Sequence, residues 1–171
     1  MTREAKAMVV DTETTGQNDP EVIEFARAEV IAEPGPIFEL GTALVDRYKP
    51  TKPIELGALA THHILPEELE GCPPAPTEFG LPRYIIGHHV DYDWEALGSP
   101  EDVKRIDTLA LSREAWPGLD SYKLGALTYH LFPAATARDL LRNAHSATVD
   151  ISLCFEIFKR AVAALQVPIA S

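Results

Sequence analysis

The sequence is poor in cysteine and lacks any long apolar run. Its only cysteines, Cys72 and Cys154, lie far apart and match no zinc or redox spacing, as expected in a reducing compartment. No stretch approaches the roughly 20 apolar residues of a transmembrane helix. Asp11 and Glu13 interrupt the N-terminal region before a signal-like apolar segment develops, which argues against an export signal. We therefore expect a cytoplasmic protein without a membrane span.

Basic residues are also scarce, since 15 Lys and Arg stand against 26 Asp and Glu and give a net charge of −11. This balance argues against a broad basic surface that binds nucleic acid by charge alone. A polyanionic substrate still fits if cations bound in the site reverse its local charge. The 171 residues and 46% hydrophobic content are ordinary for a globular protein with a buried core. Residues 1–171 are expected to form a single domain.

The hydrophobic pattern predicts three strands joined by short turns, followed by strands that alternate with helices. Strands are expected at 7–10, 21–33, 38–48, 83–89 and, as a strand edge, 105–111. Helices are expected at 56–64, 66–71, 90–97, 122–131 and 147–165, the last capped by Asn143 or Ser146. An antiparallel meander followed by this alternation implies an α/β layer structure with a mixed sheet.

Two acids stand close together in the segment VVDTETTG, where an apolar strand gives way to polar residues. Asp11 and Glu13 are two residues apart on an extended chain, so their side chains share one face. Two like charges ~4 Å apart at an effective dielectric of ~20 repel by roughly 4 kcal/mol. Exposure, a shared proton or a cation must offset that repulsion, unless the acids belong to a solvated turn formed with the threonines.

More polar residues with metal-binding or proton-transfer chemistry follow in the second half of the chain. Asp91 and Asp93 come directly after the strand expected at 83–89, and His145 precedes Asp150 near the start of the last helix. Taken singly, these residues fit surface or capping positions. A layered α/β structure can instead bring them to the edge that carries the first acid pair. Carboxylates gathered there would suit Mg²⁺ or Mn²⁺, and two such ions roughly 4 Å apart promote in-line phosphoryl displacement.

Three segments, DTETTG, HHVDYD and HSATVD, match in order the three motifs of the DEDDh branch of DnaQ-like 3′–5′ exonucleases. The intervening segments THHILPEELEG and IDTLALSREAWPGLDSYKLGAL also resemble that family, and the likeness runs from Met8 to about Ala161. The resemblance implies a ribonuclease H-like fold, with a mixed five-stranded sheet flanked by helices. It also implies release of 5′-mononucleotides from a single-stranded or 3′-end substrate, with DNA slightly favoured over RNA, by means of two Mg²⁺ or Mn²⁺ ions.

Site residues are carried over from the family motifs position by position. The metal-binding acids would be Asp11, Glu13, Asp93 and Asp150, with His145 as the general base. The substrate-binding residues would be Thr14, Thr15, Gly16, His62 and His89. The sequence departs from the motifs in two places: His89 stands where relatives usually carry Asn, and Asp91 is an acid that could substitute for Asp93. A homodimer or a polymerase or repair partner is compatible with the same sequence.

Two other functions remain open at this point. The segment from Asp11 to Thr14 superficially resembles the D-x-D-x-T loop of haloacid-dehalogenase phosphatases, although Glu13 stands where that chemistry needs a second Asp. Short motifs of this kind often match by chance. The second alternative is a non-catalytic, nuclease-like module that binds a replication or repair partner, which the intact set of acids argues against.

Overall fold

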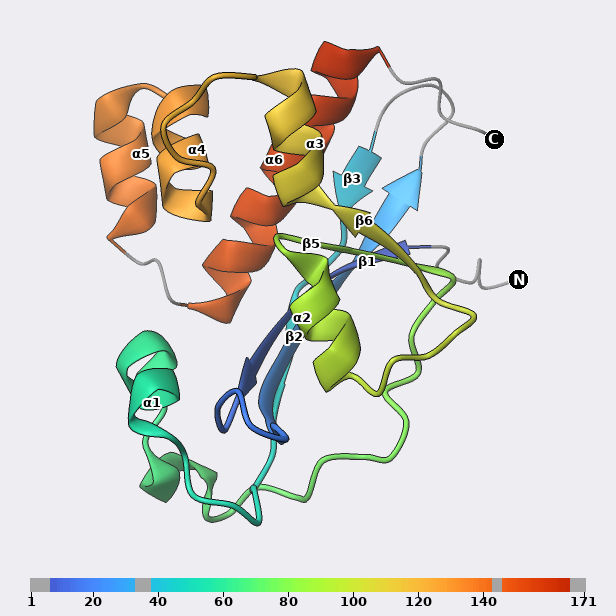
Figure 1. The fold of residues 1–171 in the computed structure, drawn as a ribbon, viewed down its shortest axis with the longest axis vertical. Coiled ribbons are helices and arrows are strands. Elements are labelled where there is room, and N and C mark those ends of the chain that lie inside the picture. The colour runs from blue at the N-terminus through green and yellow to red at the C-terminus, as the bar shows by residue number, and fades with distance from the viewer. Residues whose placement is uncertain (1–6, 33–37, 143–145, 167–171) are drawn as a thin grey trace.

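The fold is taken from a computed structural model, which describes residues 7–32, 38–142 and 146–166 (Figure 1). The strands are β1 (Ala7–Thr14), β2 (Val22–Ala32), β3 (Phe38–Leu40), β4 (Leu44–Arg47), β5 (Tyr84–Gly87) and β6 (Lys104–Asp107). The helices are α1 (Leu56–His62), the 3₁₀ helix η1 (Pro66–Leu69), α2 (Val90–Ala96), α3 (Thr108–Ala115), α4 (Leu124–Leu131), α5 (Ala134–Leu141) and α6 (Ala147–Leu165). No helix in these ranges is both long and apolar enough to cross a membrane.

All six strands form one mixed sheet in the order β3-β2-β1-β5-β6, with β4 also paired to β2. Strand β2 is antiparallel to β1, β3 and β4, whereas β5 is parallel to both β1 and β6. Because β3 and β4 pair with different stretches of the same edge of β2, the sheet is five positions wide. The expected α/β class and mixed five-stranded sheet flanked by helices are confirmed.

Several element boundaries differ from the sequence prediction. The strand expected at 38–48 is divided into β3 and β4, and at the break the Gly41 N–H donates to the carbonyl of Glu29 (2.8 Å). The strand expected at 105–111 ends at Asp107, whose carboxylate accepts from the Leu109 N–H and caps α3 (2.9 Å). The helix expected at 66–71 is the short η1, and the sequence analysis did not anticipate α5. The first two differences involve local hydrogen bonds that a hydrophobic pattern does not contain.

The end of β1 was also predicted wrongly, and this difference bears directly on the acids. Antiparallel pairing with β2 continues as far as Thr14 and Val22, so the strand does not stop at residue 10. Asp11 and Glu13 therefore lie within a paired strand rather than beyond one. The carboxylates are held by the sheet and do not belong to a solvated turn.

Each face of the sheet is covered by a helix, and β1 contributes side chains to both sides. Val9 packs with residues of α6, such as Ile151 and Phe155, in one core cluster, as the predicted apolar stripe of the last helix requires. Val10 packs with Val90 of α2 in the other cluster. Because side chains alternate along a strand, Asp11 and Glu13 continue the α6 side of the sheet, whereas Thr12 continues the α2 side.

Candidate active site

The first acids of the site lie on the neighbouring strands β1 and β2. Glu13 stands directly opposite Glu24 in the antiparallel register, and Asp11 stands opposite Ala26. Glu24 is only 6% exposed, so the strand pair places a buried carboxylate beside the predicted acid pair. The sequence analysis missed Glu24, although an acid inside the apolar strand expected at 21–33 was a signal that it has a specific partner.

Asp93 comes to β1 from the first turn of α2. One oxygen of its buried carboxylate, Oδ1, accepts hydrogen bonds from both the backbone N–H and the hydroxyl of Thr12, each at 2.8 Å. Asp91 is exposed instead, and its carboxylate pairs with the Arg105 guanidinium (2.8 Å). Of the two acids after the fourth predicted strand, Asp93 is therefore the one that faces β1.

The pKa values of these acids show that they act on one another. Burial raises the pKa of Asp11 well above its ordinary range, and the charges of Asp93, Glu13 and Asp150 raise it further. Burial likewise raises the pKa of Glu13 to about 7, with added contributions from Glu24, Asp150 and Asp93. Asp93 and Asp150 therefore lie near enough to Asp11 and Glu13 for their charges to raise the pKa of both carboxyls.

The structure describes only part of the third motif segment, HSATVD. Asp150 lies in the first turn of α6, which begins after the N-cap residue Ser146. Ser146 is one of the two predicted capping residues, but its hydroxyl bonds to the hydroxyl of Thr148 (2.9 Å) and not to a backbone N–H. His145, the predicted general base, lies outside the described residues, as does Asn143.

The predicted metal ligands offer only carboxylate oxygens. Such donors suit the hard cations Mg²⁺ and Mn²⁺, and a cation between Asp11, Glu13 and their neighbours would offset the repulsion that raises their pKa values. The donor chemistry therefore fits a divalent cation. Within residues 7–32, 38–142 and 146–166, no three acid, histidine or cysteine side chains are already arranged around one point as metal ligands, so metal binding here remains a proposal.

A cavity of about 470 Å³ opens beside Glu13. Its walls come from the β1–β2 turn, from α1 and from α2. It is lined by Glu13, Thr14, Gly16, Gln17, Glu55, Gly57, Ala58, Thr61, His62 and Tyr92. Three of the five predicted substrate-binding residues, Thr14, Gly16 and His62, are therefore gathered next to the acids.

The other two predicted substrate-binding residues do not line this cavity. The Thr15 side chain is buried and closes the β1–β2 turn, where its hydroxyl accepts from the Glu21 N–H (3.0 Å). His89 precedes α2 in a left-handed backbone conformation, with φ 67°, and its N–H donates to the Asp107 carboxylate (2.8 Å). Both residues hold local backbone structure near the site.

Two further residues of the cavity wall were not predicted. The Thr14 hydroxyl donates to the Gly16 carbonyl (2.9 Å) and also hydrogen-bonds to the hydroxyl of Tyr92. Glu55 reaches the same turn, where its carboxylate accepts from the Gln17 N–H (3.3 Å). Tyr92 could have been suspected because it lies between the two acids of HHVDYD, but no local pattern marks Glu55.

His62 carries a hydrogen-bond donor on the wall of the cavity. Its Nδ1 accepts from the Ile64 N–H (2.9 Å), which places the proton of the neutral ring on Nε2. This Nε2 is buried and has no hydrogen-bond partner of ordinary geometry among the described residues. Burial lowers the pKa of the ring, with the Thr14 backbone acting in the opposite direction. The ring is therefore held between the Ile64 N–H at Nδ1 and the Thr14 backbone, at the edge of the cavity.

No family model and no curated protein sequence matches this chain. Solved structures do resemble it. Exonuclease X in complex with a 5′-overhanging duplex DNA aligns with a TM-score of 0.71 and 20% identity, over 95% of this chain and 94% of the other. E. coli exonuclease I in complex with a dT13 oligonucleotide aligns with a TM-score of 0.69 and 20% identity, over 95% of this chain.

A zinc-bound form of E. coli exonuclease I in complex with single-stranded DNA aligns similarly, with a TM-score of 0.67 and 18% identity over 94% of this chain. The chain spans about two fifths of exonuclease I, namely 42% and 41% of the two structures, but nearly the whole length of exonuclease X. At such identities the likeness concerns the fold, and the fold of this chain is the ribonuclease H-like α/β fold of these nucleases.

Proposed function

We propose that the protein is a metal-dependent 3′–5′ exonuclease of the DnaQ-like DEDDh group, resembling exodeoxyribonuclease X. The observation that carries this proposal is the buried Asp11, whose pKa is raised by burial and by the nearby charges of Asp93, Glu13 and Asp150, beside a cavity bordered by Glu13 and His62. The shared fold supports it, because the similar chains are exonucleases in complex with DNA.

In the proposed reaction, Asp11, Glu13, Asp93 and Asp150 would hold two Mg²⁺ or Mn²⁺ ions. When bound, these ions supply Lewis-acid stabilisation of the attacking and leaving oxygens. Thr12 fixes Asp93 through two hydrogen bonds, which keeps one carboxylate oxygen oriented while the other is available as a ligand. His145 accepts a proton from the water that attacks phosphorus. The P–O3′ bond breaks, giving a 5′-mononucleotide and a strand that ends in a new 3′-hydroxyl.

The cavity beside Glu13 would hold the 3′-terminal nucleotide. Thr14 and Gly16 form its floor, and the Nε2–H of His62 would donate to an oxygen of the nucleotide. We propose DNA as the preferred substrate over RNA, since the similar exonucleases are in complex with DNA.

The test is degradation of matched single-stranded and double-stranded DNA and RNA, each labelled at either end, with Mg²⁺, with Mn²⁺ and with chelator. The proposal predicts stepwise shortening from the 3′ end that requires a divalent ion. Intact substrates under all conditions, combined with Mn²⁺ binding, would indicate a binding module. Release of phosphate from a small phosphomonoester without action on oligonucleotides would instead indicate a phosphatase.

A further inference from the structure

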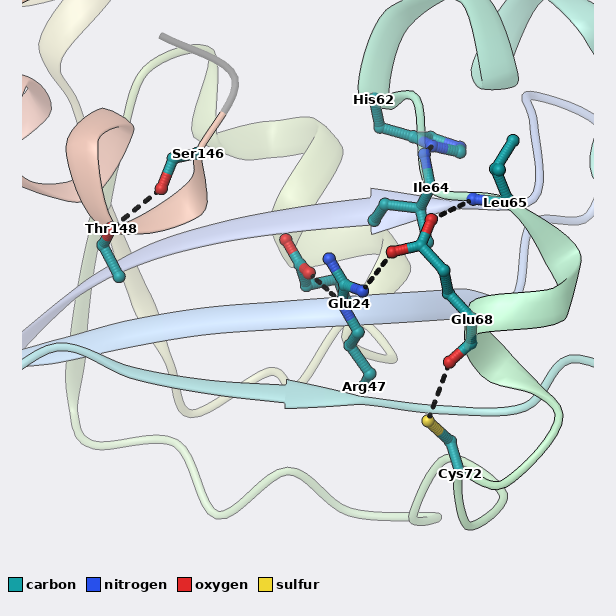
Figure 2. Close-up of polar contacts among 9 residues, drawn as sticks. All are labelled: Glu24, Arg47, His62, Ile64, Leu65, Glu68, Cys72, Ser146 and Thr148. Carbon is teal, nitrogen blue, oxygen red and sulfur yellow. Dashed lines mark hydrogen bonds and ion pairs between the residues drawn. The ribbon is translucent and has the colours of Figure 1, made fainter. Parts of the chain in front are cut away.

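A chain of two ion pairs, which we call the Arg47 brace, lies next to the candidate site. Arg47, the last residue of β4, pairs through Nε with the Glu24 carboxylate (2.6 Å) and through Nη1 with the Glu68 carboxylate (2.9 Å). Figure 2 shows its guanidinium between the two acids. The brace therefore connects β2, β4 and η1, three elements that are separate in the sequence.

One end of the brace is fixed to the strands that carry the predicted acids. Glu24 lies opposite Glu13 on β2, and its side chain is only 8% exposed. A buried carboxylate without a partner is strongly unfavourable, so Arg47 is held to Glu24. The guanidinium consequently keeps a fixed place relative to the β1–β2 pair.

The other end of the brace is fixed to the segment that carries His62. Glu68 uses one carboxylate oxygen for Arg47 and the other to accept from the Leu65 N–H (2.8 Å) at the start of η1. The preceding residue, Ile64, is buried and donates its N–H to Nδ1 of His62. An unbroken series of contacts thus runs from Glu24 to the His62 ring (Figure 2).

A second cavity shares Glu13 and His62 with the cavity proposed for the terminal nucleotide. This space of about 370 Å³ is bordered by Glu13, Glu24, Arg47 and His62, among other residues. Glu13 and His62 also border the larger cavity proposed for the terminal nucleotide. The separation of these two residues therefore helps to set the width of both spaces.

We infer that Arg47 is a positioning residue that fixes His62 against the strand carrying Glu13 through its ion pairs with Glu24 and Glu68. Its consequence for turnover rests on the proposed exonuclease function. Arg47 acts through the His62 segment, since its Nε and Nη1 are engaged by the carboxylates of Glu24 and Glu68. Detaching the brace at Glu68 keeps the Arg47–Glu24 pair and the acids in place, and loosens the wall proposed to contact the terminal nucleotide.

A neighbouring ion pair provides the matched control. Asp46 of β4 pairs with Arg27 of β2 (2.6 Å), and its side chain is 48% exposed, close to the 43% of Glu68. The Asp46 pair joins the same two strands as Arg47 and Glu24 but does not reach η1. Asp46→Asn therefore removes an exposed charge pair from the same sheet edge, whereas Glu68→Gln detaches the brace from the His62 segment and keeps an oxygen for the Leu65 N–H.

Steady-state kinetics on a single-stranded DNA oligonucleotide tests the inference. Glu68→Gln is expected to raise KM about threefold with little change in kcat, whereas Asp46→Asn changes KM by less than about 1.5-fold, the modest scale of exposed ion pairs. In a His62→Ala background, Glu68→Gln should add almost nothing, because residues acting through one another are not additive. Two results would overturn the inference. One is a KM increase by Glu68→Gln that is as large in the His62→Ala background as without it. The other is an equal change of KM in Glu68→Gln and Asp46→Asn.

Hydrogen exchange of residues 62–69 provides a readout that does not depend on turnover. The brace predicts faster exchange of this segment in Glu68→Gln and in Arg47→Gln than in Asp46→Asn and the unmodified protein. Equal exchange in all four proteins refutes the brace, whatever the activity. If the unmodified protein degrades no nucleic acid, the exonuclease proposal fails, and the exchange comparison still decides whether Arg47 positions the His62 segment.

Discussion

Two glutamates at opposite ends of the β1–β2 turn have contrasting surroundings. Glu21 accepts hydrogen bonds from the Thr51 N–H (2.6 Å), the Thr51 hydroxyl and the Lys52 N–H (3.2 Å), and these donors lower its pKa. Burial raises the pKa of Glu13 to about 7, and the neighbouring acids Glu24, Asp150 and Asp93 contribute to this shift. The hydrogen bonds to Glu21 stabilise its ionised carboxylate and hold the loop at residues 51–52. Glu13 has like charges around it instead, so a bound cation would stabilise its ionised form most.

The largest expected effect comes from removing the charge of Glu13. Glu13→Gln should lower kcat on single-stranded DNA by about 100-fold or more, the scale of losing one preorganised electrostatic group in an active site. Glu21→Gln is the control, since it changes the same residue type at the other end of the turn, and it should leave kcat within about twofold. Equal losses in both variants would remove the distinction between the two glutamates.

A smaller effect is expected from the hydrogen bond that holds Asp93. Thr12→Val removes the hydroxyl donor and leaves the backbone donor, so Mn²⁺ should bind about tenfold more weakly, because a hydrogen bond to a charged group contributes about 1.5 kcal/mol. Calorimetric titration measures this. Thr128→Val is a matched control, because Thr128 is also buried and donates only to the Leu124 carbonyl within α4. Unchanged Mn²⁺ affinity in Thr12→Val would argue against Asp93 as a ligand.

The raised pKa of Glu13 predicts how stability depends on pH without divalent ions. Between the ordinary value of 4.5 and about 7, Glu13 binds more protons in the folded protein than in the unfolded chain, so its contribution to stability falls as pH rises through this window. Because Glu13 is partly exposed, we expect a loss of about 1 kcal/mol, or roughly 3 °C in Tm. Thermal unfolding in chelator at about pH 5 and about pH 8 measures it.

Added Mn²⁺ should oppose this loss at the higher pH, because it binds the ionised carboxylates. In Glu13→Gln the loss should become smaller, although Asp11, whose pKa is also raised, keeps part of it. A Tm in chelator that rises steadily across the same interval would contradict the pKa assigned to Glu13.

The smallest expected effect is on the free energy of unfolding, which should change in opposite directions when Glu13 and Glu21 are each replaced by Gln. This difference in sign compares the two glutamates most sharply. At about pH 8 in chelator, Glu13→Gln should stabilise the protein by about 0.5 kcal/mol, since it removes repulsion. Glu21→Gln should destabilise it by a similar small amount, because charge-assisted hydrogen bonds to the 51–52 loop are weakened. Chemical denaturation of both variants under the same conditions measures the two changes. A loss of stability in both would mean that Glu13 is also held by favourable contacts.

The sequence predicted the features that depend on neighbouring residues in the chain. The apolar stripe of α6 and the acids of DTETTG and HHVDYD could be recognised because each pattern is local. Glu24 was missed because its position opposite Glu13 depends on strand register, which the sequence does not specify. The Arg47 brace depends on three separate elements for the same reason.

Other differences have equally specific physical causes. Thr15 and Gly16 are adjacent in the motif, but the turn directs the Thr15 hydroxyl to the Glu21 N–H, leaving Gly16 at the cavity. The motif register favoured Asp93 over Asp91, but Asp91 stayed a possible substitute because both acids lie in the first turn of one helix. Pairing of Asp91 with Arg105 and of Asp93 with Thr12 separates them in space.

The most direct test of the account is a time course with a single-stranded DNA oligonucleotide labelled at its 5′ end, in the presence of Mn²⁺. The account predicts a ladder of labelled products that shorten by one nucleotide at a time, together with unlabelled 5′-mononucleotides identified by mass spectrometry, and no change in chelator. Immediate release of a labelled mononucleotide, internal fragments or an intact oligonucleotide would contradict the assignment of a 3′–5′ exonuclease.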